Sequence, residues 1–505
     1  MKAAPRLLVA AFAGCVGLMV VRFALTRTLV AGDSAWYFSA ARSLLVDHDL
    51  DLANEYQHFA NDVSPRSGNK RITAVLNPDP RTGRLAPGYS LGTSLAVLPF
   101  MALVQVVVRG DGYGAAYQLA AGIGSALWGF LGLLLLWRLG PSAIGREVAT
   151  TGIRGEPGDP ALLATLTIWL GTPLVYYMTI EPLMSHAISV FATTALLMVW
   201  LQSRDQPGVA RWALMGALGG FATIVRYQDA VFCLVPVLDA VLSGALRRDP
   251  RRTLLGLVAF AAAASGFVGV QLYANAFYFG SPWITGYPAL AEFHWLRPSL
   301  FTALFSLHAG LITFAPVTLL CLAGLYQLTR ERRLVGALLI SVLVLQVYVT
   351  AAWLVPDQGA AFGNRMLLSC TPILALGLMR WLERPRPWVS AGFIALNATL
   401  ALLYCARILP DPYIVQKPVG VVNASPRSTP AHASLTETLR TMSTVLVSGP
   451  SIEVPLRGRG LDSAGIAADA ALSPRLRSAL AALTGAIDSD RTFRASFHPR
   501  PPERP

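Results

Sequence analysis

Long uncharged apolar runs recur along most of this chain and constrain its fold more than any other feature. Of its 505 residues, 54% are apolar and only 14% are charged. A run of about 20 apolar residues can cross the hydrocarbon core of a bilayer as a helix. Such runs lie at 7–30, 114–138, 161–178, 185–203, 211–226, 229–246, 253–279, 302–328, 334–353, 366–382 and 388–408. The pattern predicts an all-α, polytopic helical membrane protein with about eleven spans.

The basic residues predict how these spans are oriented. Lys and Arg accumulate in short cytoplasmic loops. With the N-terminus inside and each run crossing once, the basic segments LRRDPRR, TRERR and RWLERPRP all fall on the inner side. Basic inner loops and contacts with anionic lipid headgroups therefore explain the net charge of +13. No nucleic-acid partner is expected. We expect a multi-pass protein of the cytoplasmic (inner) membrane.

The predicted topology divides the chain into two parts. Residues 1–410 form the transmembrane module, whose first outer loop is 31–113. Residues 411–505 contain no spanning run and are rich in Ala, Ser, Arg and Pro. They are expected to form an extracytoplasmic tail that is a small domain or partly disordered.

Two juxtamembrane elements are expected within the first outer loop. Over 34–46, apolar residues recur at helical spacing and leave Ser39, Arg42 and Ser43 on the opposite side. This pattern is typical of an amphipathic helix in the membrane interface. The second element, 85–108, is apolar but is interrupted by prolines and glycines. A full crossing there would place the basic loops outside, so a juxtamembrane or re-entrant element is favoured, with a kinked span as the alternative.

The acids of the first outer loop are candidates for chemistry. Asp33 lies where the chain leaves the first span. It either caps the following helix or acts as a general base that takes the proton of an acceptor hydroxyl. Asp49 and Asp51 resemble the acidic pair that holds a divalent ion in soluble sugar-nucleotide enzymes, but they fit a turn equally well. No cofactor is required, and a metal at Asp49 and Asp51 is kept as the alternative.

Further ionisable side chains fall at the predicted outer ends of later spans, where they are costly and tend to mark function. Glu181 and His186 lie in one link between spans, although a lone histidine there is also typical of packing. Arg226 is the last residue of the run 211–226, and Arg365 directly precedes the run 366–382. A guanidinium can bond two phosphate oxygens, and the alternative is contact with lipid headgroups.

Three residues near these groups are added as candidate substrate contacts. Asp229 follows Arg226, Asn364 precedes Arg365, and Tyr287 ends the aromatic loop 280–287. Aromatic faces stack on sugars, but Trp and Tyr also populate membrane interfaces by default.

A series of motifs lies in order along residues 7–408. It begins with GDSAWYFSAARSLLVDHDLDLANEY at 32–56 and continues through LAPGYSLGTSLAVLPF, YYMTIEPLMSHAISVF, VRYQDA, FGSPWITGY, LFSLHAGLITFAPV and AAFGNR. This series resembles bacterial family-39-like membrane glycosyltransferases of the GT-C fold, relatives of protein O-mannosyltransferases and lipid A aminoarabinose transferases.

The resemblance implies a polyprenyl-phosphate-linked sugar as donor and Asp33 as the catalytic base. Glu181 is the best match to a second acid that follows a later span in those relatives. Two departures are present: the usual Asp-Glu pair is Asp33-Ser34, and the Lys-Pro-Pro of aminoarabinose transferases is replaced by a segment beginning at Arg84. Arg84 is assigned to a phosphate contact in its place.

These observations together predict an inverting hexosyl- or pentosyltransferase. It would act on the outer (periplasmic) face of the membrane and pass a monosaccharide to a hydroxyl of a lipid, a glycan or a protein. Asp33 would accept the proton, and arginines would stabilise the departing lipid phosphate. The alternative is a transporter or flippase of lipid-linked sugars, a class that typically shows charges buried mid-span and related halves.

Overall fold

The computed structural model describes residues 3–30, 32–61, 78–145, 159–204, 208–287, 293–353, 358, 361–383 and 386–405. Within these ranges the chain forms helices and no strand. Six of the described helices are long and apolar enough to cross a membrane, which confirms an all-α, polytopic helical membrane protein. All described residues belong to one compact unit, Met1–Leu409. The predicted tail 411–505 lies outside the described residues.

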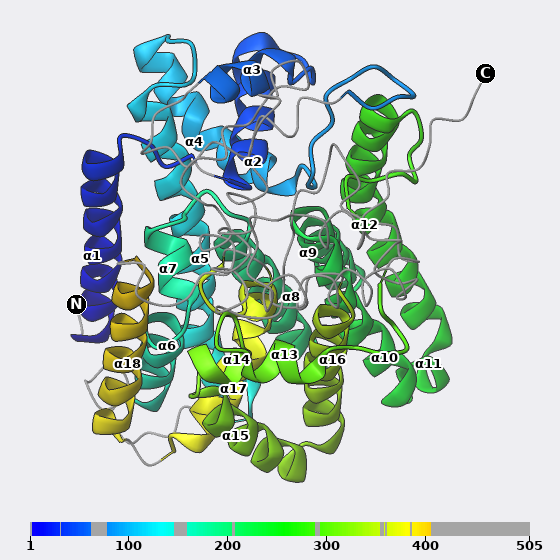
Figure 1. The fold of residues 1–505 in the computed structure, drawn as a ribbon. Helices are drawn as coiled ribbons and strands as arrows, with labels where there is room; N and C mark the ends of the chain where they lie inside the picture. Colours follow the sequence, from blue (N-terminus) through cyan, green and yellow to red (C-terminus); the bar gives the residue numbers. More distant parts are fainter. Residues whose placement is uncertain are drawn as a thin grey trace, which may run out of the picture. The chain divides into compact units, whose positions relative to one another are not determined.

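The helical elements can be followed along the chain in Figure 1. In chain order they are α1 (Ala3–Thr26), α2 (Ser34–Arg42), the π-helical turn η1 (Ser43–Asp47), α3 (Ala53–Asn61), α4 (Gly92–Val108), α5 (Ala115–Ala143), α6 (Pro160–Leu170), α7 (Leu174–Thr179), α8 (His186–Ser203), α9 (Val209–Val225), the 3-10 helix η3 (Tyr227–Cys233), α10 (Leu234–Leu242), α11 (Ala245–Arg248), α12 (Pro250–Phe279), α13 (Leu300–Phe305), α14 (Leu311–Phe314), α15 (Thr318–Glu331), α16 (Arg333–Ala352), the 3-10 helix η5 (Arg365–Cys370), α17 (Thr371–Trp381) and α18 (Pro387–Cys405).

The membrane-length helices differ in how far they are covered by protein. They are α1, α5, α8, α12, α16 and α18. The α8 helix lies between α5 and α9, and α9 packs along α12. The α1 and α12 helices instead expose large apolar side chains, such as Leu25 at 70% and Leu255 at 60%. Such exposure is typical of helices that face lipid, because lipid tails are as apolar as these side chains.

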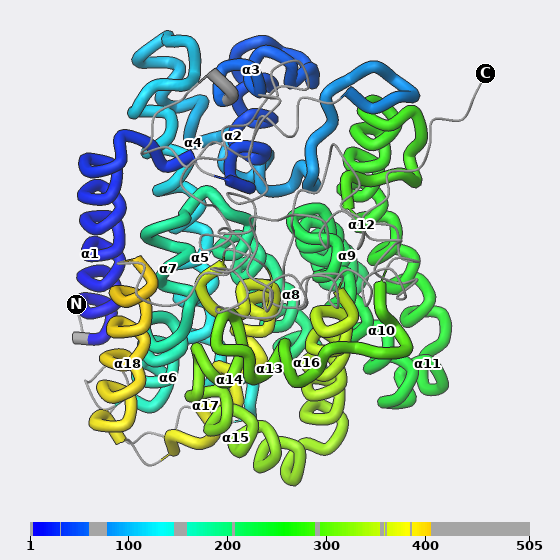
Figure 2. The backbone as a smooth tube through the Cα atoms, in the orientation of Figure 1, coloured from blue at the N-terminus to red at the C-terminus, as the bar shows by residue number. Residues whose placement is uncertain are grey.

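Among the described residues, four predicted spans are built from more than one helical element: 161–178, 229–246, 302–328 and 366–382. The run 161–178 breaks between α6 and α7, where Pro173 has no backbone N–H to donate and disfavours helical geometry in the residue before it. The run 302–328 contains α13, α14 and α15, which are separated at Gly310 and Pro316. The breaks are visible along the backbone in Figure 2.

The two expected elements of the first outer loop are helical. The α4 helix begins at Gly92, which packs so closely on the backbone of Ile224 in α9 that a larger side chain would not fit. Met101, in the middle of α4, is fully buried, whereas Val106 and Val107 near its end are 73% and 81% exposed. The first half of α4 therefore packs on protein, as predicted for a juxtamembrane element, and its last turns do not.

The polar side of α2 is buried, which corrects the expected amphipathic helix in the interface. Ser39 and Ser43 have no exposed surface, and Arg42 is 6% exposed. Arg42 bonds to Glu55 of α3 at 2.8 Å. Both faces of α2 are therefore covered by protein. Its apolar face packs on apolar side chains, and its polar face packs on polar ones.

Candidate functional site

Asp33 is paired with Arg365. Asp33 occupies the N-cap position of α2, but its side chain makes no capping hydrogen bond. Its Oδ2 instead lies 3.0 Å from a terminal nitrogen of Arg365, and the two side chains are 27% and 17% exposed. Arg365 opens η5 shortly after Gly363, whose φ of +62° favours glycine. An acid from the first loop and a cation from a late loop thus meet at a site that solvent can reach.

Arg226 lies beside this pair. The α9 helix ends at Val225, and Arg226 continues in an extended conformation while remaining 3% exposed. One terminal nitrogen of Arg226 lies 2.9 Å from Nδ1 of His186 and donates to the Arg365 carbonyl at 3.3 Å. The other approaches the Met366 sulfur at 2.9 Å. These contacts fix a second guanidinium against the segment that carries Arg365.

The contact with Arg226 also defines the state of His186. An arginine N–H can only donate, so Nδ1 must carry a lone pair. The imidazole of His186 is therefore neutral, with its hydrogen on Nε2. Nε2 is buried and has no hydrogen-bond partner among the described residues, and the ring meets that of Tyr177 at 4.6 Å between centroids. His186 thus acts as an acceptor that orients Arg226.

Glu181 supplies a second carboxylate near the arginines. It lies between α7 and α8, is half-buried, and accepts a long hydrogen bond of 3.5 Å from the Tyr176 hydroxyl. Burial raises the pKa of Glu181, while the nearby charges of Arg365 and Arg22 oppose that shift. The arginines therefore favour the ionised form that burial disfavours.

Tyrosines cover one side of the Asp33–Arg365 pair. Tyr37 stacks on Tyr89 at 5.3 Å, and Tyr89 meets Tyr287 edge-on at 5.5 Å. Burial raises the pKa of the Tyr37 phenol to about 12, with a smaller contribution from the charge of Asp33. These phenols stay neutral and offer ring faces and hydroxyl groups, which suit a polyhydroxylated ligand.

Three other predicted contacts bond to the framework. Arg84 is exposed, donates to the Phe277 carbonyl at 2.7 Å and stacks on that ring. Asp229 is fully buried and accepts from the Ser189 hydroxyl at 2.5 Å. Asn364 donates to the Ala303 carbonyl at 2.9 Å. The structure thus brings Asp33, Arg226 and Arg365 together. The hydrogen bonds described for Arg84, Asp229 and Asn364 instead join them to other parts of the protein.

Asp49 and Asp51 form turns. The Asp49 carboxylate accepts from the Ser43 hydroxyl at 2.8 Å, and Asp51 accepts from the backbone N–H of Ala53 at the start of α3 at 3.1 Å. Among the described residues, no group of three or more His, Cys, Asp or Glu side chains is arranged to hold a metal ion. The geometry of both acids matches the turn that was the alternative to a metal site.

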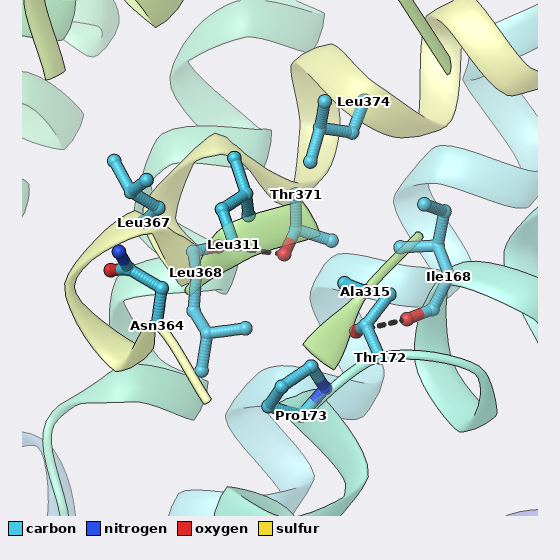
Figure 3. A pocket seen from close by; sticks show the side chains of 10 residues that line it. All are labelled: Ile168, Thr172, Pro173, Leu311, Ala315, Asn364, Leu367, Leu368, Thr371 and Leu374. Carbon is cyan, nitrogen blue, oxygen red and sulfur yellow. Dashed lines mark hydrogen bonds between the residues drawn. The ribbon is translucent and has the colours of Figure 1, made fainter. Parts of the chain in front are cut away.

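An apolar cavity is lined in part by Asn364, Leu367 and Leu368, in and next to η5 (Figure 3). It is lined by Ile168, Thr172, Pro173, Leu311, Ala315, Asn364, Leu367, Leu368, Thr371 and Leu374. The Thr172 hydroxyl donates to the Ile168 carbonyl, and that of Thr371 donates to the Leu368 carbonyl, both at 2.6 Å. None of the described residues that line this cavity is charged, so its chemistry does not match that of the Asp33 site.

Three residues near the site, Tyr37, Tyr89 and Arg22, were not predicted as site residues from the sequence. Tyr37 lies in the segment 34–46, whose apolar residues predict only a helix face, and Tyr89 lies in the apolar segment 85–108, whose pattern marks no single side chain. Arg22 of α1 donates to the Thr28 carbonyl at 3.1 Å, and its charge acts on Glu181. An arginine inside an apolar run is costly, so that signal alone would have identified Arg22 as a candidate.

Comparisons with known proteins add a likeness to a solved structure. No family model matches the sequence, and no curated protein matches it. Among solved structures, the chain is similar to the crystal structure of ArnT from Cupriavidus metallidurans in the apo state, with 15% sequence identity and a TM-score of 0.45. The match covers 81% of this chain and 68% of that chain. The functional proposal therefore depends on the residues of the site itself.

Proposed function

We propose that this chain is a membrane glycosyltransferase of the GT-C type that transfers a monosaccharide from a polyprenyl-phosphate donor to a hydroxyl acceptor, with inversion. The observation that carries the proposal is the Asp33–Arg365 pair at 3.0 Å, with Arg226 fixed beside it. A carboxylate can take a proton, and two guanidinium groups can hold a phosphate. The chain embeds this combination among membrane helices, which suits a donor with a lipid tail.

In the proposed reaction the carboxylate of Asp33 and the two guanidinium groups have separate roles. Asp33 takes the proton of the acceptor hydroxyl while that oxygen attacks the anomeric carbon of the donor. The bond between this carbon and the phosphate oxygen breaks, and the electron pair leaves with polyprenyl phosphate. Arg226 and Arg365 stabilise the negative charge that develops on that phosphate.

The proposal also gives a reason for the ion pair itself. The phosphodiester of the donor carries one negative charge on two free oxygens, as a carboxylate does, so an arriving donor that also contacts Arg226 would compete with Asp33 for Arg365. That exchange would leave the carboxylate free to accept a proton. Donor binding would therefore precede activation of the acceptor.

Tyr89 and Tyr287 are proposed to contact the sugar. Both are partly exposed and offer aromatic faces and hydroxyl groups, while the buried Tyr37 stacks on Tyr89 and supports it. Glu181, half-buried near Arg365, is proposed to bind a sugar or acceptor hydroxyl. The acceptor is a lipid, glycan or protein, and the reaction is placed on the outer face of the inner membrane.

The direct test is release of polyprenyl phosphate by the purified full chain. The protein in nanodiscs is given polyprenyl-phosphate sugars of several kinds together with an envelope extract that supplies hydroxyl acceptors, and lipid products are followed by mass spectrometry. We expect release with at least one sugar, and loss of release in Asp33→Asn with unchanged insertion. Asp51→Asn is the matched control, because Asp51 lies in the same loop but forms a turn.

The same preparation separates the transporter alternative. A flippase would move intact lipid-linked sugar across proteoliposomes without forming polyprenyl phosphate. That result, or normal release by Asp33→Asn, contradicts the proposal. Mass spectrometry of envelope glycans and glycoproteins from cells with and without the chain would identify the acceptor.

A further inference from the structure

The backbone at Arg365 and Met366 is held by side chains from several elements. The Met366 N–H donates to Gln358 Oε1 at 3.1 Å, and the Met366 carbonyl accepts from Gln228 Nε2 at 2.6 Å. The Arg365 carbonyl accepts from Arg226 at 3.3 Å. The Arg365 carbonyl, the Met366 N–H and the Met366 carbonyl are therefore all hydrogen-bonded to side chains from outside η5.

Gln228 in turn is paired with Gln346 of α16. Gln346 Nε2 donates to the Gln228 carbonyl at 2.9 Å, and Gln346 Oε1 accepts from Gln228 Nε2 at 3.3 Å. Gln346 has no exposed surface and lies within a helix long and apolar enough to cross a membrane. A buried amide in such a helix is costly unless its hydrogen bonds are made.

The position of Gln228 makes this pairing relevant to both arginines. Gln228 lies two residues after Arg226, and its amide bonds to the residue after Arg365. The Gln346–Gln228–Met366 chain therefore sets the distance between the two backbone segments from which the guanidinium groups extend. A phosphate held by both groups depends on that distance, because charge-assisted hydrogen bonds weaken steeply away from ideal geometry.

We infer that Gln346 is a positioning residue that acts through Gln228 to hold Arg226 and Arg365 at the spacing required by a phosphate. This inference rests on the proposed function, in which the two arginines bind the donor phosphate. Gln346 touches neither the Asp33 carboxylate nor either guanidinium in any described hydrogen bond, so its effect is indirect.

The first test requires no donor. Gln346→Met keeps the length of the side chain and removes both hydrogen bonds, while Gln271→Met removes a comparably buried amide elsewhere. Gln271, which is 5% exposed, binds the Leu91 N–H at 2.8 Å and lies in α12. Phenylglyoxal modification of Arg365, followed by mass spectrometry, reports how firmly that side chain is held. We expect Gln346→Met to accelerate it about fivefold and Gln271→Met to leave it unchanged.

The second test measures binding of polyprenyl phosphate to the full chain in detergent. Gln346→Met should weaken binding about five- to tenfold, and Gln271→Met should not weaken it. If Gln346→Met does not fold, Gln228→Ala is the second variant. It removes the bond to Met366 but leaves Gln346 bonded to the backbone carbonyl of residue 228, so that buried amide keeps an acceptor. It should accelerate Arg365 modification in the same way.

Two outcomes would overturn the positioning role. The first is an Arg365 modification rate in Gln346→Met equal to that of the wild type. The second is an equal loss of phosphate binding in the Gln271 control. If the wild type binds no polyprenyl phosphate, the proposed donor is wrong, and the Arg365 modification rates still decide the role of Gln346.

Discussion

The α2 helix carries an arginine–carboxylate pair near each of its ends, and the two pairs are built differently. At its start, Asp33 and Arg365 pair at 3.0 Å with side-chain exposures of 27% and 17%. At its end, Arg42 and Glu55 pair at 2.8 Å with exposures of 7% and 0%. The first pair is open to a ligand, and the second is closed.

The groups around the two arginines differ as well. Arg42 donates its Nε hydrogen to the Asp111 carbonyl at 2.8 Å and also forms an ion pair with Asp47. Its guanidinium carbon lies 4.5 Å from the centre of the Tyr113 ring. Its Nε, one terminal nitrogen and its planar face therefore all contact protein. Such a residue joins α2 to the rest of the first loop and has little capacity for a substrate.

The contrast indicates which charges belong to the framework and which to chemistry. A fully bonded arginine stabilises one conformation, and removing it leaves a carboxylate without compensation. A partly exposed pair contributes little to stability because water screens both groups. Two opposite charges at a point that solvent can reach are better suited to an exchange of partners with a ligand.

The largest difference is expected in activity. Asp33→Asn should reduce polyprenyl phosphate release by about 10²–10⁴-fold, because the general base is lost. Glu55→Gln should retain most activity, since Glu55 lies in the closed pair. Initial rates of the two variants at equal protein and saturating donor check this prediction. Equal losses in both variants would show that the two pairs do not differ in role.

The next difference is expected in stability. Arg42→Met should destabilise the fold by about 3–5 kcal/mol, because Glu55 remains buried without a partner. Arg365→Met should cost about 1 kcal/mol or less, since Asp33 can be solvated. Thermal unfolding in detergent, compared at one pH, measures both. A larger loss for Arg365→Met than for Arg42→Met would reverse the assignment of framework and site.

The sequence predicted the arrangement of the site better than its details. The apolar runs and basic loops placed Asp33, Arg226 and Arg365 at the same ends of their spans, and the structure brings these residues together. That inference worked because hydropathy and charge are local properties of a run. The roles of these residues remain predictions.

Tertiary contacts account for what the sequence did not predict. The periodicity of α2 was typical of an interfacial helix, but its polar side is buried by Glu55, which belongs to another helix. The bonds between Gln228 and Gln346 join residues 118 positions apart, and no local pattern marks them. Pro173 is a local signal for a break, but it lies inside the uniformly apolar run 161–178, which hydropathy alone predicts as one span.

A smaller difference is expected in pH dependence. Burial raises the pKa of Glu55 from 4.5 to about 7, although Arg42 opposes the shift, and one carboxylate oxygen is buried without a hydrogen bond from any described residue. Between these values the folded chain binds more protons than the unfolded chain, so stability falls as the pH rises through this window. We expect a loss of about 2 kcal/mol between pH 5 and 8. Glu55→Gln should remove this loss, and an unchanged pH profile in that variant would contradict the assignment.

The smallest expected effect concerns affinity, and its direction is the sharpest test of the open pair. If a donor phosphate displaces Asp33 from Arg365, Asp33→Asn should bind polyprenyl phosphate about three- to fivefold more tightly, because the competing charge is gone. Glu55→Gln should leave this affinity unchanged, since Arg42 is 6% exposed and keeps its contacts with Asp47 and Asp111. Titration of both variants at low and high salt measures the effect, which should shrink with ionic strength. Weaker binding by Asp33→Asn would mean that Asp33 holds the donor rather than competing with it, and Arg365 would then have no exchange of partners to perform.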